Sequence, residues 1–409
     1  MIMPYVSKKA QLGPRAKRWV ALLLLGVFVA YLVVVSSGSS RQLRDIEADW
    51  VVVQAVRHDL DPFTDVGRLA ETLGESINRP GLSELDDGPW IHPRTPGALL
   101  VLYPLGLVRM ETSTILLLAF SGAALIWLAL VAVPRLSGLA VEKVLLWTVL
   151  LLASAPVFSA FEFGTQSIVI SALVALTWLR ARKGDGWVVG IALGVASVLK
   201  VWPLLLVVPL AAKRRWSMVA STLGTTAILM LAGFLVTDTN LKTTLVALQA
   251  ASERWIGFSH NGSLGAIAFR VGVEPIVLLV PLAVAGSCLS WAAARRSLDL
   301  GLAFGIVVGL LVVPLSWEHY NVSLLLVSAW FLGTQTRGRA LVWTSVGIAA
   351  LGMAARSPNR HDLPVVGLAT LAERLLVLGA LCYVLVVGEP MQDVIVRSRL
   401  EPEKFVRGA

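Results

Sequence analysis

Every histidine of this sequence lies outside its long apolar runs, near carboxylates, amides or basic residues. Histidine and carboxylate side chains are those that most often exchange protons with a substrate. A chain that collects these groups at one face of a membrane, and leaves mostly lysine and arginine at the other, is expected to bind or transform a polar ligand at the first face. The histidines are His58, His92, His260, His319 and His361.

The first candidate catalytic group directly follows the first apolar run. If the segment from Leu43 to Val56 is helical, Asp45 and Asp49 are four residues apart and share one face. A carboxylate at a membrane interface, partly shielded from water, can act as a general base. The competing interpretation is an acidic, solvated helix beside the membrane, and spacing alone does not separate the two.

Two turn-like sequences follow in the same polar segment. His58-Asp59-Leu60-Asp61 contains an Asp-x-Asp spacing that can hold a divalent ion. An aspartate before a proline is also a common turn former, and we favour the turn. His92-Pro93-Arg94 places an imidazole and a guanidinium where the chain returns to an apolar run, with a rigid turn bracketed by prolines as the alternative.

Short polar interruptions between apolar runs form a third group. The runs are too close together for a solvated loop, so these polar groups are expected to face one another or a ligand. A lysine in such a place needs an anionic partner. The interruptions are Glu162 with Gly164-Thr165-Gln166, Lys200 with Trp202-Pro203, and Ser316-Trp317-Glu318-His319-Tyr320; Glu253-Arg254-Trp255 and His260-Asn261-Gly262 join them from a longer polar segment.

The composition predicts the elements that must position these residues. Of 409 residues, 56% are hydrophobic and 15% charged, and the mean hydropathy is +0.76. We therefore predict an all-α polytopic membrane protein with about twelve transmembrane helices, because apolar runs that suit a bilayer crossing recur along the chain. The expected spans are 19–37, 112–132, 144–162, 165–181, 186–200, 201–212, 217–236, 276–294, 300–315, 320–334, 339–354 and 371–388.

The charge distribution predicts the orientation of these spans. The formal net charge is +9, and the excess of lysine and arginine lies in short loops on one side, as the positive-inside rule requires. This pattern argues against nucleic-acid binding and places both termini in the cytoplasm. We expect a single transmembrane domain over residues 1–409, with long extracytoplasmic loops at 38–111 and 237–275 and a basic cytoplasmic tail at 389–409.

The interruptions, in this order, resemble glycosyltransferase family 87, membrane enzymes of the GT-C type that use polyprenyl-phosphate sugars and include mycobacterial mannosyltransferases of phosphatidylinositol mannosides. The resemblance covers residues 45–335. Three motifs depart from the usual pattern: Thr165-Gln166 replaces Gly-Gln, His92-Pro93-Arg94 replaces Tyr-Pro-Pro, and Asn261-Gly262 replaces Asn-Gln. The motifs are Asp49-Trp50, Asp61-Pro62-Phe63, His92 to Pro104, Gly164-Thr165-Gln166, Lys200-Val201-Trp202-Pro203, Lys213-Arg214-Arg215-Trp216, Asn261-Gly262-Ser263-Leu264 and Ser316-Trp317-Glu318-His319-Tyr320.

The resemblance implies an inverting transfer of mannose from a polyprenyl-phosphate donor to a lipid-linked or cell-envelope glycan on the extracytoplasmic side of the cell membrane. Such a reaction needs a base on the acceptor hydroxyl and positive groups on the departing phosphate. Asp49 matches the family's base position, and no cofactor or metal is expected. The expected phosphate ligands are Lys200, Arg94 and His319; the expected sugar or acceptor ligands are Trp50, Gln166, Asn261, Trp317, Glu318, His92 and His260.

Other functions remain open at this point. Arabinofuranosyl transfer from a polyprenyl phosphate is possible within the same family. A transporter or flippase of a lipid-linked sugar would also have many spans and buried charges, and a non-catalytic scaffold is a further alternative. Against a transporter, the polar groups crowd toward one face, and no matched pair of interrupted segments indicates inverted repeats.

Overall fold

The computed structural model describes residues 44–74, 91–92, 94–138, 154–184, 186–256, 261–334, 338–354 and 365–387. All regular elements in these ranges are helices, which confirms the predicted all-α class. The expected span at 19–37, the first part of the span at 144–162 and the tail at 389–409 lie outside the described residues, as do His260 and His361.

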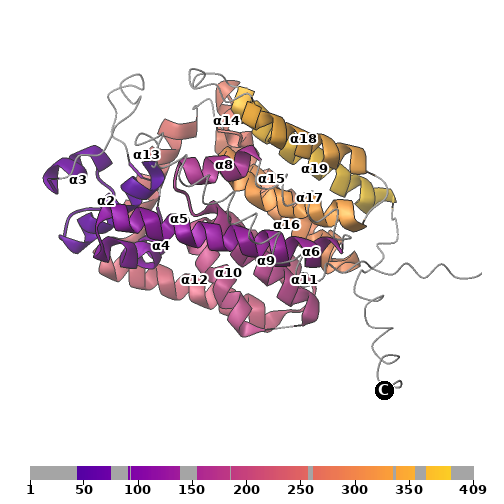
Figure 1. The fold of residues 1–409 in the computed structure, drawn as a ribbon, viewed down its shortest axis with the longest axis horizontal. Helices are drawn as coiled ribbons and strands as arrows, with labels where there is room; N and C mark the ends of the chain where they lie inside the picture. The colour runs from indigo at the N-terminus through magenta and orange to yellow at the C-terminus, as the bar shows by residue number, and fades with distance from the viewer. Residues whose placement is uncertain are drawn as a thin grey trace, which may run out of the picture.

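Figure 1 shows the helices of the described ranges in chain order. They are α2 (Arg44–Arg57), α3 (Val66–Thr72), α4 (Pro96–Leu102), the 3₁₀ helix η2 (Tyr103–Leu107), α5 (Met110–Trp127), the π-helical turn η3 (Leu128–Ala132), α6 (Val133–Ser137), α8 (Ala155–Glu162), α9 (Ser167–Lys183), α10 (Trp187–Leu199), η4 (Trp202–Leu206), α11 (Val207–Ala212), α12 (Trp216–Val236), α13 (Leu241–Ile256), α14 (Leu264–Arg270), α15 (Pro275–Arg296), α16 (Leu298–Val312), η5 (Glu318–Asn321), α17 (Val322–Thr334), α18 (Arg339–Ala354) and α19 (Val365–Val387).

Most expected spans coincide with helices, but the expected number of membrane crossings is not confirmed. In the described ranges, four helical stretches are long and apolar enough to cross a bilayer: Met110–Ser137, Trp216–Val236, Pro275–Arg296 and Val366–Val387. Other apolar helices are shorter, among them α10, α16 and the pair η4 and α11. A helix of 13 residues, such as α10, rises only about 20 Å at 1.5 Å per residue, which is less than a bilayer core of about 30 Å.

The segment expected as a second long loop, 237–275, contains two helices. In α13 the buried residues Thr244, Ala247 and Ala251 are three and four positions apart, which is the spacing of one helix face. In the first polar segment, the stretch considered as a helix at Leu43–Val56 is helical from Arg44 on, as α2, and α3 follows it.

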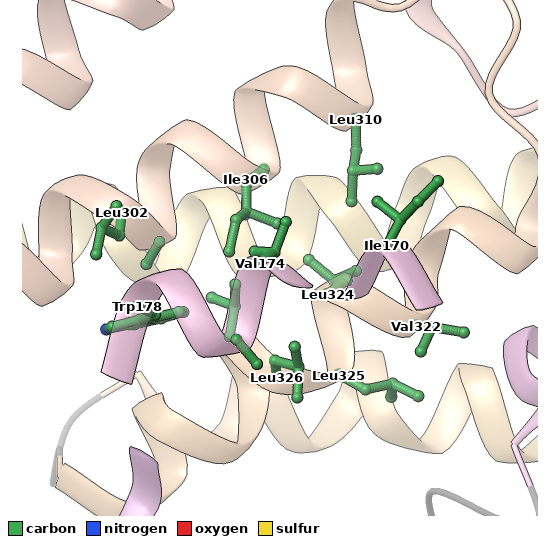
Figure 2. Close-up of a cluster of buried hydrophobic side chains, with 14 of the residues drawn as sticks. Ile170, Val174, Trp178, Leu302, Ile306, Leu310, Val322, Leu324, Leu325 and Leu326 are labelled. Carbon is green, nitrogen blue, oxygen red and sulfur yellow. The ribbon is translucent and has the colours of Figure 1, made fainter. Parts of the chain in front are cut away.

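The main core lies between α9, α16 and α17 (Figure 2). Ile170, Val174 and Trp178 of α9 are four residues apart and buried, so they form one apolar stripe along the helix. The indole of Trp178 lies against Trp330 of α17, with ring centroids 5.6 Å apart. Because Gln166 immediately precedes α9 and η5 immediately precedes α17, this core also fixes the helix ends that carry candidate site residues.

Two glycines allow α4 to approach α12 closely. A Cβ atom added to Gly97 would lie 3.2 Å from the backbone of Leu229. One added to Gly233 would lie 2.6 Å from the backbone nitrogen of Gly97 and closer still to Pro96. This contact sets the position of the α4 N-terminus, and therefore of Arg94, relative to the rest of the bundle.

Candidate active site

Asp49 lies on the buried face of α2, with only 1% of its surface exposed. Its neighbours Ile46, Ala48 and Val52 are also buried. The interpretation of this segment as a solvated acidic helix is therefore wrong. Asp45, one turn earlier, is partly exposed, and its backbone N–H donates to the carbonyl of Phe163 at 3.1 Å, which holds the start of α2 against the end of α8.

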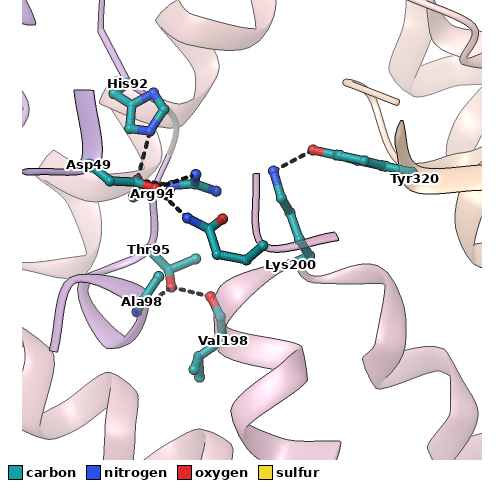
Figure 3. A network of polar contacts seen from close by, with 9 residues as sticks. Asp49, His92, Arg94, Thr95, Ala98, Val198, Lys200 and Tyr320 are labelled. Atoms are coloured by element: carbon teal, nitrogen blue, oxygen red, sulfur yellow. Dashed lines mark hydrogen bonds and ion pairs between the residues drawn. The ribbon is translucent and has the colours of Figure 1, made fainter. Parts of the chain in front are cut away.

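Three side chains donate hydrogen bonds to the carboxylate of Asp49 (Figure 3). Arg94 binds it twice, through Nε to Oδ1 at 2.6 Å and through Nη2 to Oδ2 at 2.9 Å. Nε2 of His92 lies 2.8 Å from Oδ1, and Nε2 of Gln166 donates to Oδ2. The structure thus brings together four residues that the sequence placed in three separate motifs.

This environment keeps Asp49 ionised. Burial by itself raises the pKa of a carboxyl group, but the positive charge of Arg94, the interaction with His92 and the hydrogen bonds from both outweigh it and hold the pKa of Asp49 well below its usual range. The site therefore holds a buried carboxylate anion with a guanidinium beside it at every physiological pH.

Thr95 links the Asp49 cluster to the next part of the site. Its Oγ1 accepts from the backbone N–H of Ala98 at 3.1 Å, as an N-cap of α4, and donates to the carbonyl of Val198 at 2.8 Å. Val198 is two residues before Lys200, at the end of α10. The hydroxyl therefore joins the segment that carries Arg94 to the segment that carries Lys200 (Figure 3).

Lys200 faces Tyr320 rather than a carboxylate. Its Nζ donates to the Tyr320 hydroxyl at 2.6 Å and lies 4.6 Å from the centre of the phenol ring. An ammonium group has three N–H donors, so two remain without a hydrogen-bond partner among the described residues. The anionic partner expected for Lys200 is thus not supplied by a hydrogen-bonded side chain in the described ranges.

His319 belongs to the same part of the site as Lys200. It lies in η5, buried, with its ring 4.8 Å from that of Tyr320 and 6.3 Å from that of Phe163. Its neighbour Glu318 is buried as well. The short 3₁₀ turn η5 therefore delivers two of the predicted site residues and the partner of Lys200.

Other predicted ligands make structural contacts. Asn261 donates to the carbonyl of Pro314 at 3.0 Å and accepts from the backbone N–H groups of Ser263 and Ser316, each at 3.1 Å. The indole nitrogen of Trp50 donates to the carbonyl of Val108 at 2.9 Å. Each of these side chains fastens a loop through these hydrogen bonds.

Trp317 packs near Trp255, with ring centroids 6.3 Å apart.

The turn favoured at Asp61 is confirmed, because its carboxylate accepts from the N–H of Phe63 at 2.9 Å and the side chain is exposed. In the described ranges no three His, Cys, Asp or Glu side chains come together as a metal site would require.

Three buried residues beside the site were not predicted from the sequence: Asn321, Glu373 and Arg374. Glu373 and Arg374 lie in the last expected span, 371–388. An ionisable pair inside an apolar run is a functional candidate by default, so this signal was present in the sequence. Asn321 follows the Ser316–Tyr320 motif directly and had no signal of its own.

A helical bundle with apolar helices of membrane-spanning length, and with a buried, ion-paired carboxylate beside a lysine, defines a membrane protein with a polar reaction or binding site. The model of glycosyltransferase family 87 matches residues 90–317, which is more than half of the chain. The chain therefore belongs to glycosyltransferase family 87.

Characterised mycobacterial proteins are similar to this chain. A polyprenol-phosphate-mannose-dependent α-(1-2)-phosphatidylinositol pentamannoside mannosyltransferase of Mycolicibacterium smegmatis is 27% identical over 290 residues, covering 65% of this chain and 67% of the relative. A protein of the same description from Mycobacterium tuberculosis is 28% identical over 282 residues, covering 64% of each chain. A phosphatidylinositol mannoside mannosyltransferase of M. tuberculosis is 27% identical over 369 residues, covering 82% of each chain.

Proposed function

We propose that this protein transfers mannose from a polyprenyl-phosphate donor to a hydroxyl group of a glycolipid or cell-envelope glycan, at the extracytoplasmic face of the cell membrane. The family and the named activities of the similar proteins support the donor class. The observation that carries the proposal is the pair of Asp49 and Arg94, a buried base candidate and a phosphate-binding group in direct contact.

In this reaction Asp49 is the general base. The acceptor hydroxyl gives its proton to a carboxylate oxygen of Asp49 while its oxygen forms a bond to the anomeric carbon of mannose. The bond between that carbon and the donor phosphate oxygen breaks, and its electron pair leaves with the lipid phosphate. Attack opposite the leaving group inverts the anomeric configuration.

Arg94 connects the base to the phosphate. A guanidinium has five N–H donors, and Arg94 uses Nε and Nη2 on Asp49, whereas its Nη1 has no hydrogen bond to any described residue. Nη1 is thus free for a phosphate oxygen while the other two nitrogens remain on the carboxylate. A bound phosphate shares the positive charge of Arg94, which weakens its hold on Asp49 and makes the carboxylate a stronger base.

Lys200 and His319 complete the phosphate side. The two uncommitted N–H groups of Lys200 suit a phosphate at the membrane edge, where the head of a polyprenyl lipid must lie. The positive charges of Arg94 and Lys200 neutralise the charge that develops on the leaving group, so the reaction does not require a metal ion.

Gln166 is the best supported sugar ligand. Its Nε2 faces the Asp49 carboxylate, an obligate acceptor, and this fixes the orientation of the amide. Its Oε1 is buried and has no hydrogen-bond partner in the described part of the chain. A sugar hydroxyl would satisfy this atom, because a buried unpaired acceptor costs about 1–3 kcal/mol. Trp50, His92, Asn261, His260, Trp317 and Glu318 remain candidate ligands of the sugar or the acceptor.

The test is mannose transfer by the purified full-length chain in lipid, with radiolabelled polyprenyl-phosphate mannose and a crude envelope glycolipid extract. Asp49→Asn should lower the rate by about 100-fold or more, since general base catalysis contributes at least that much. Asp61→Asn is the matched control, because Asp61 is exposed and an asparagine preserves its turn.

Each other outcome has a definite meaning. Full activity of Asp49→Asn would refute its role as the base. If the wild type transfers arabinofuranose but not mannose, the sugar is wrong and the reaction class stands. If no polyprenyl-phosphate sugar is a donor and the lipid is translocated across the bilayer, the protein is a transporter.

A further inference from the structure

Arg374 connects four parts of the chain, although it lies in α19, outside the segment that matches the family. Its side chain is fully buried. Nε donates to Oδ1 of Asn321 at 2.7 Å, and Nη1 donates to the carbonyls of Gly262 at 2.9 Å and Leu310 at 3.0 Å. Nη2 donates to the carbonyl of Trp317 at 3.2 Å. One guanidinium thus joins α19 to the end of α16, the loop after α13 and the segment around η5.

Asn321 is held from both sides by the same helix. Its Oδ1 accepts from Arg374, and its Nδ2 donates to Oε2 of Glu373 at 2.7 Å and to the carbonyl of Thr370 at 3.3 Å. All polar atoms of this amide are therefore occupied, and its orientation is fixed. Because Asn321 is the last residue of η5, this clamp determines how η5 lies against α19.

The loop at Gly262 is held equally tightly. A Cβ atom at Gly262 would lie 2.6 Å from Cγ2 of Thr370 and 2.9 Å from the carbonyl oxygen of Gly367. Its backbone N–H donates to the carbonyl of Ser316 at 3.0 Å. The segment before η5 therefore lies between this loop and α19. Arg374 of α19 donates hydrogen bonds to the loop, at Gly262, and to the segment, at Trp317.

These contacts converge on Tyr320, the residue that binds Lys200. Tyr320 lies between the two residues of the segment that Arg374 contacts, Trp317 and Asn321, and its backbone N–H donates to the Trp317 carbonyl at 3.0 Å. That carbonyl also accepts from Arg374. The phenol hydroxyl lies 2.6 Å from Nζ of Lys200, so its position depends on the segment that Arg374 holds.

We propose that Arg374 is a positioning residue for the donor-phosphate half of the active site: it holds the segment from Trp317 to Asn321 so that Tyr320 fixes the ammonium group of Lys200. The kinetic test of this inference rests on the proposed function. Lysine cannot replace the arginine, because a single nitrogen does not reach four acceptors arranged around a planar fork.

The matched control is Arg182, a partly buried arginine that also binds backbone carbonyls. It donates to Oδ1 of Asp299 at 2.8 Å and to the carbonyls of Arg135 and Leu136 at 2.8 and 3.1 Å. It lies at the end of α9 opposite to Gln166, about 24 Å away along the helix at 1.5 Å per residue. Arg182→Lys removes a comparable set of contacts far from the site.

The kinetic test compares Arg374→Lys and Arg182→Lys in lipid, at a temperature where both are folded. Arg374→Lys should raise the donor KM by about tenfold, the loss of roughly one charge-assisted hydrogen bond. The acceptor KM should stay the same, and Arg182→Lys should leave both constants unchanged. Tyr320→Phe should produce a similar donor defect, and the double variant should be no worse than either single variant, because both act through Lys200.

A second measurement does not depend on activity. Hydrogen–deuterium exchange should be faster in Arg374→Lys than in the wild type at the amides of Gly262, Ser316 and Tyr320, and unchanged there in Arg182→Lys. If exchange is faster in Arg374→Lys but the wild type transfers no mannose, the positioning role stands and the proposed function is refuted. Unchanged exchange, equal donor and acceptor defects, or additive effects with Tyr320→Phe would refute the positioning role.

Discussion

Arg94 and Asp49 form a bidentate ion pair in which Nε and Nη2 of the guanidinium lie 2.6 and 2.9 Å from the two carboxylate oxygens. Both side chains are buried, and both come from the first polar segment of the chain. Geometry of this kind is specific for arginine, because only a planar fork presents two parallel N–H groups to a carboxylate. Because of this ion pair, the charge state of Asp49 depends on Arg94.

The pH profile of the reaction should show that Arg94 controls the ionisation of Asp49. Arg94 and His92 keep the folded-state pKa of Asp49 below its unfolded value, so the stabilisation by ionised Asp49 is complete above about pH 4 and is lost only as the pH falls further. In Arg94→Gln, burial is no longer opposed by the guanidinium, and the pKa of Asp49 rises. The acidic limb of kcat/KM should move toward neutral pH, as measured between pH 4 and 8; an unchanged limb would contradict the pairing.

The hydroxyl of Tyr320 should control donor affinity. Tyr320→Phe removes the oxygen that accepts from Lys200 and preserves the ring, so the ammonium group loses its one hydrogen bond to a described residue. The donor KM should rise by about tenfold or more, corresponding to a hydrogen bond of a charged group, with a smaller change in kcat. Tyr103→Phe is a suitable control in initial-rate measurements, since Tyr103 lies in η2, at the end of α4 away from Arg94 in the chain.

The close contact of α4 with α12 should tolerate no side chain at Gly233. Gly233→Ala places a methyl group against the backbone of Pro96 and Gly97, and α4 must move. The free energy of unfolding should fall by about 1–3 kcal/mol, and transfer should weaken because Arg94 precedes α4. Gly224→Ala in the same helix meets no atom within 4 Å and should do neither. Thermal unfolding and transfer rates test both variants, and equal behaviour would show that the crossing is not tight.

A substitution at the C-terminal end of α9 should lower stability and leave activity unchanged. Asp299 accepts from Trp178 and from Arg182, each at 2.8 Å. Asp299→Asn removes the charge that compensates Arg182 and should lower the free energy of unfolding by about 2 kcal/mol. The KM values for donor and acceptor should remain those of the wild type, because these residues lie far from Asp49. A kinetic change of more than about twofold at a temperature where the variant is folded would connect this cluster to the site.

The local features of this protein could be predicted from its sequence. Apolar runs and their periodicity predicted most of the helices, because the choice of helix depends on residues three and four positions apart. The spacing of Asp45 and Asp49 placed both on one helix, and the Asp61-Pro62 pair predicted a turn that the hydrogen bond to Phe63 confirms. The number of membrane crossings could not be predicted from the apolar runs, since several apolar helices are too short to cross by themselves.

Which residues meet depends on the packing of the helices and could not be predicted from local patterns. Asp49 is 43, 45 and 117 residues from His92, Arg94 and Gln166, and Lys200 is 120 residues from Tyr320. Pairings over such distances depend on how helices pack. That packing depends on small features such as the glycines of α4 and α12, which no local periodicity reveals. In the same way, the pair Glu373 and Arg374 stands out in the sequence as two charges inside an apolar run, but only the packing of α19 shows that Arg374 contacts η5.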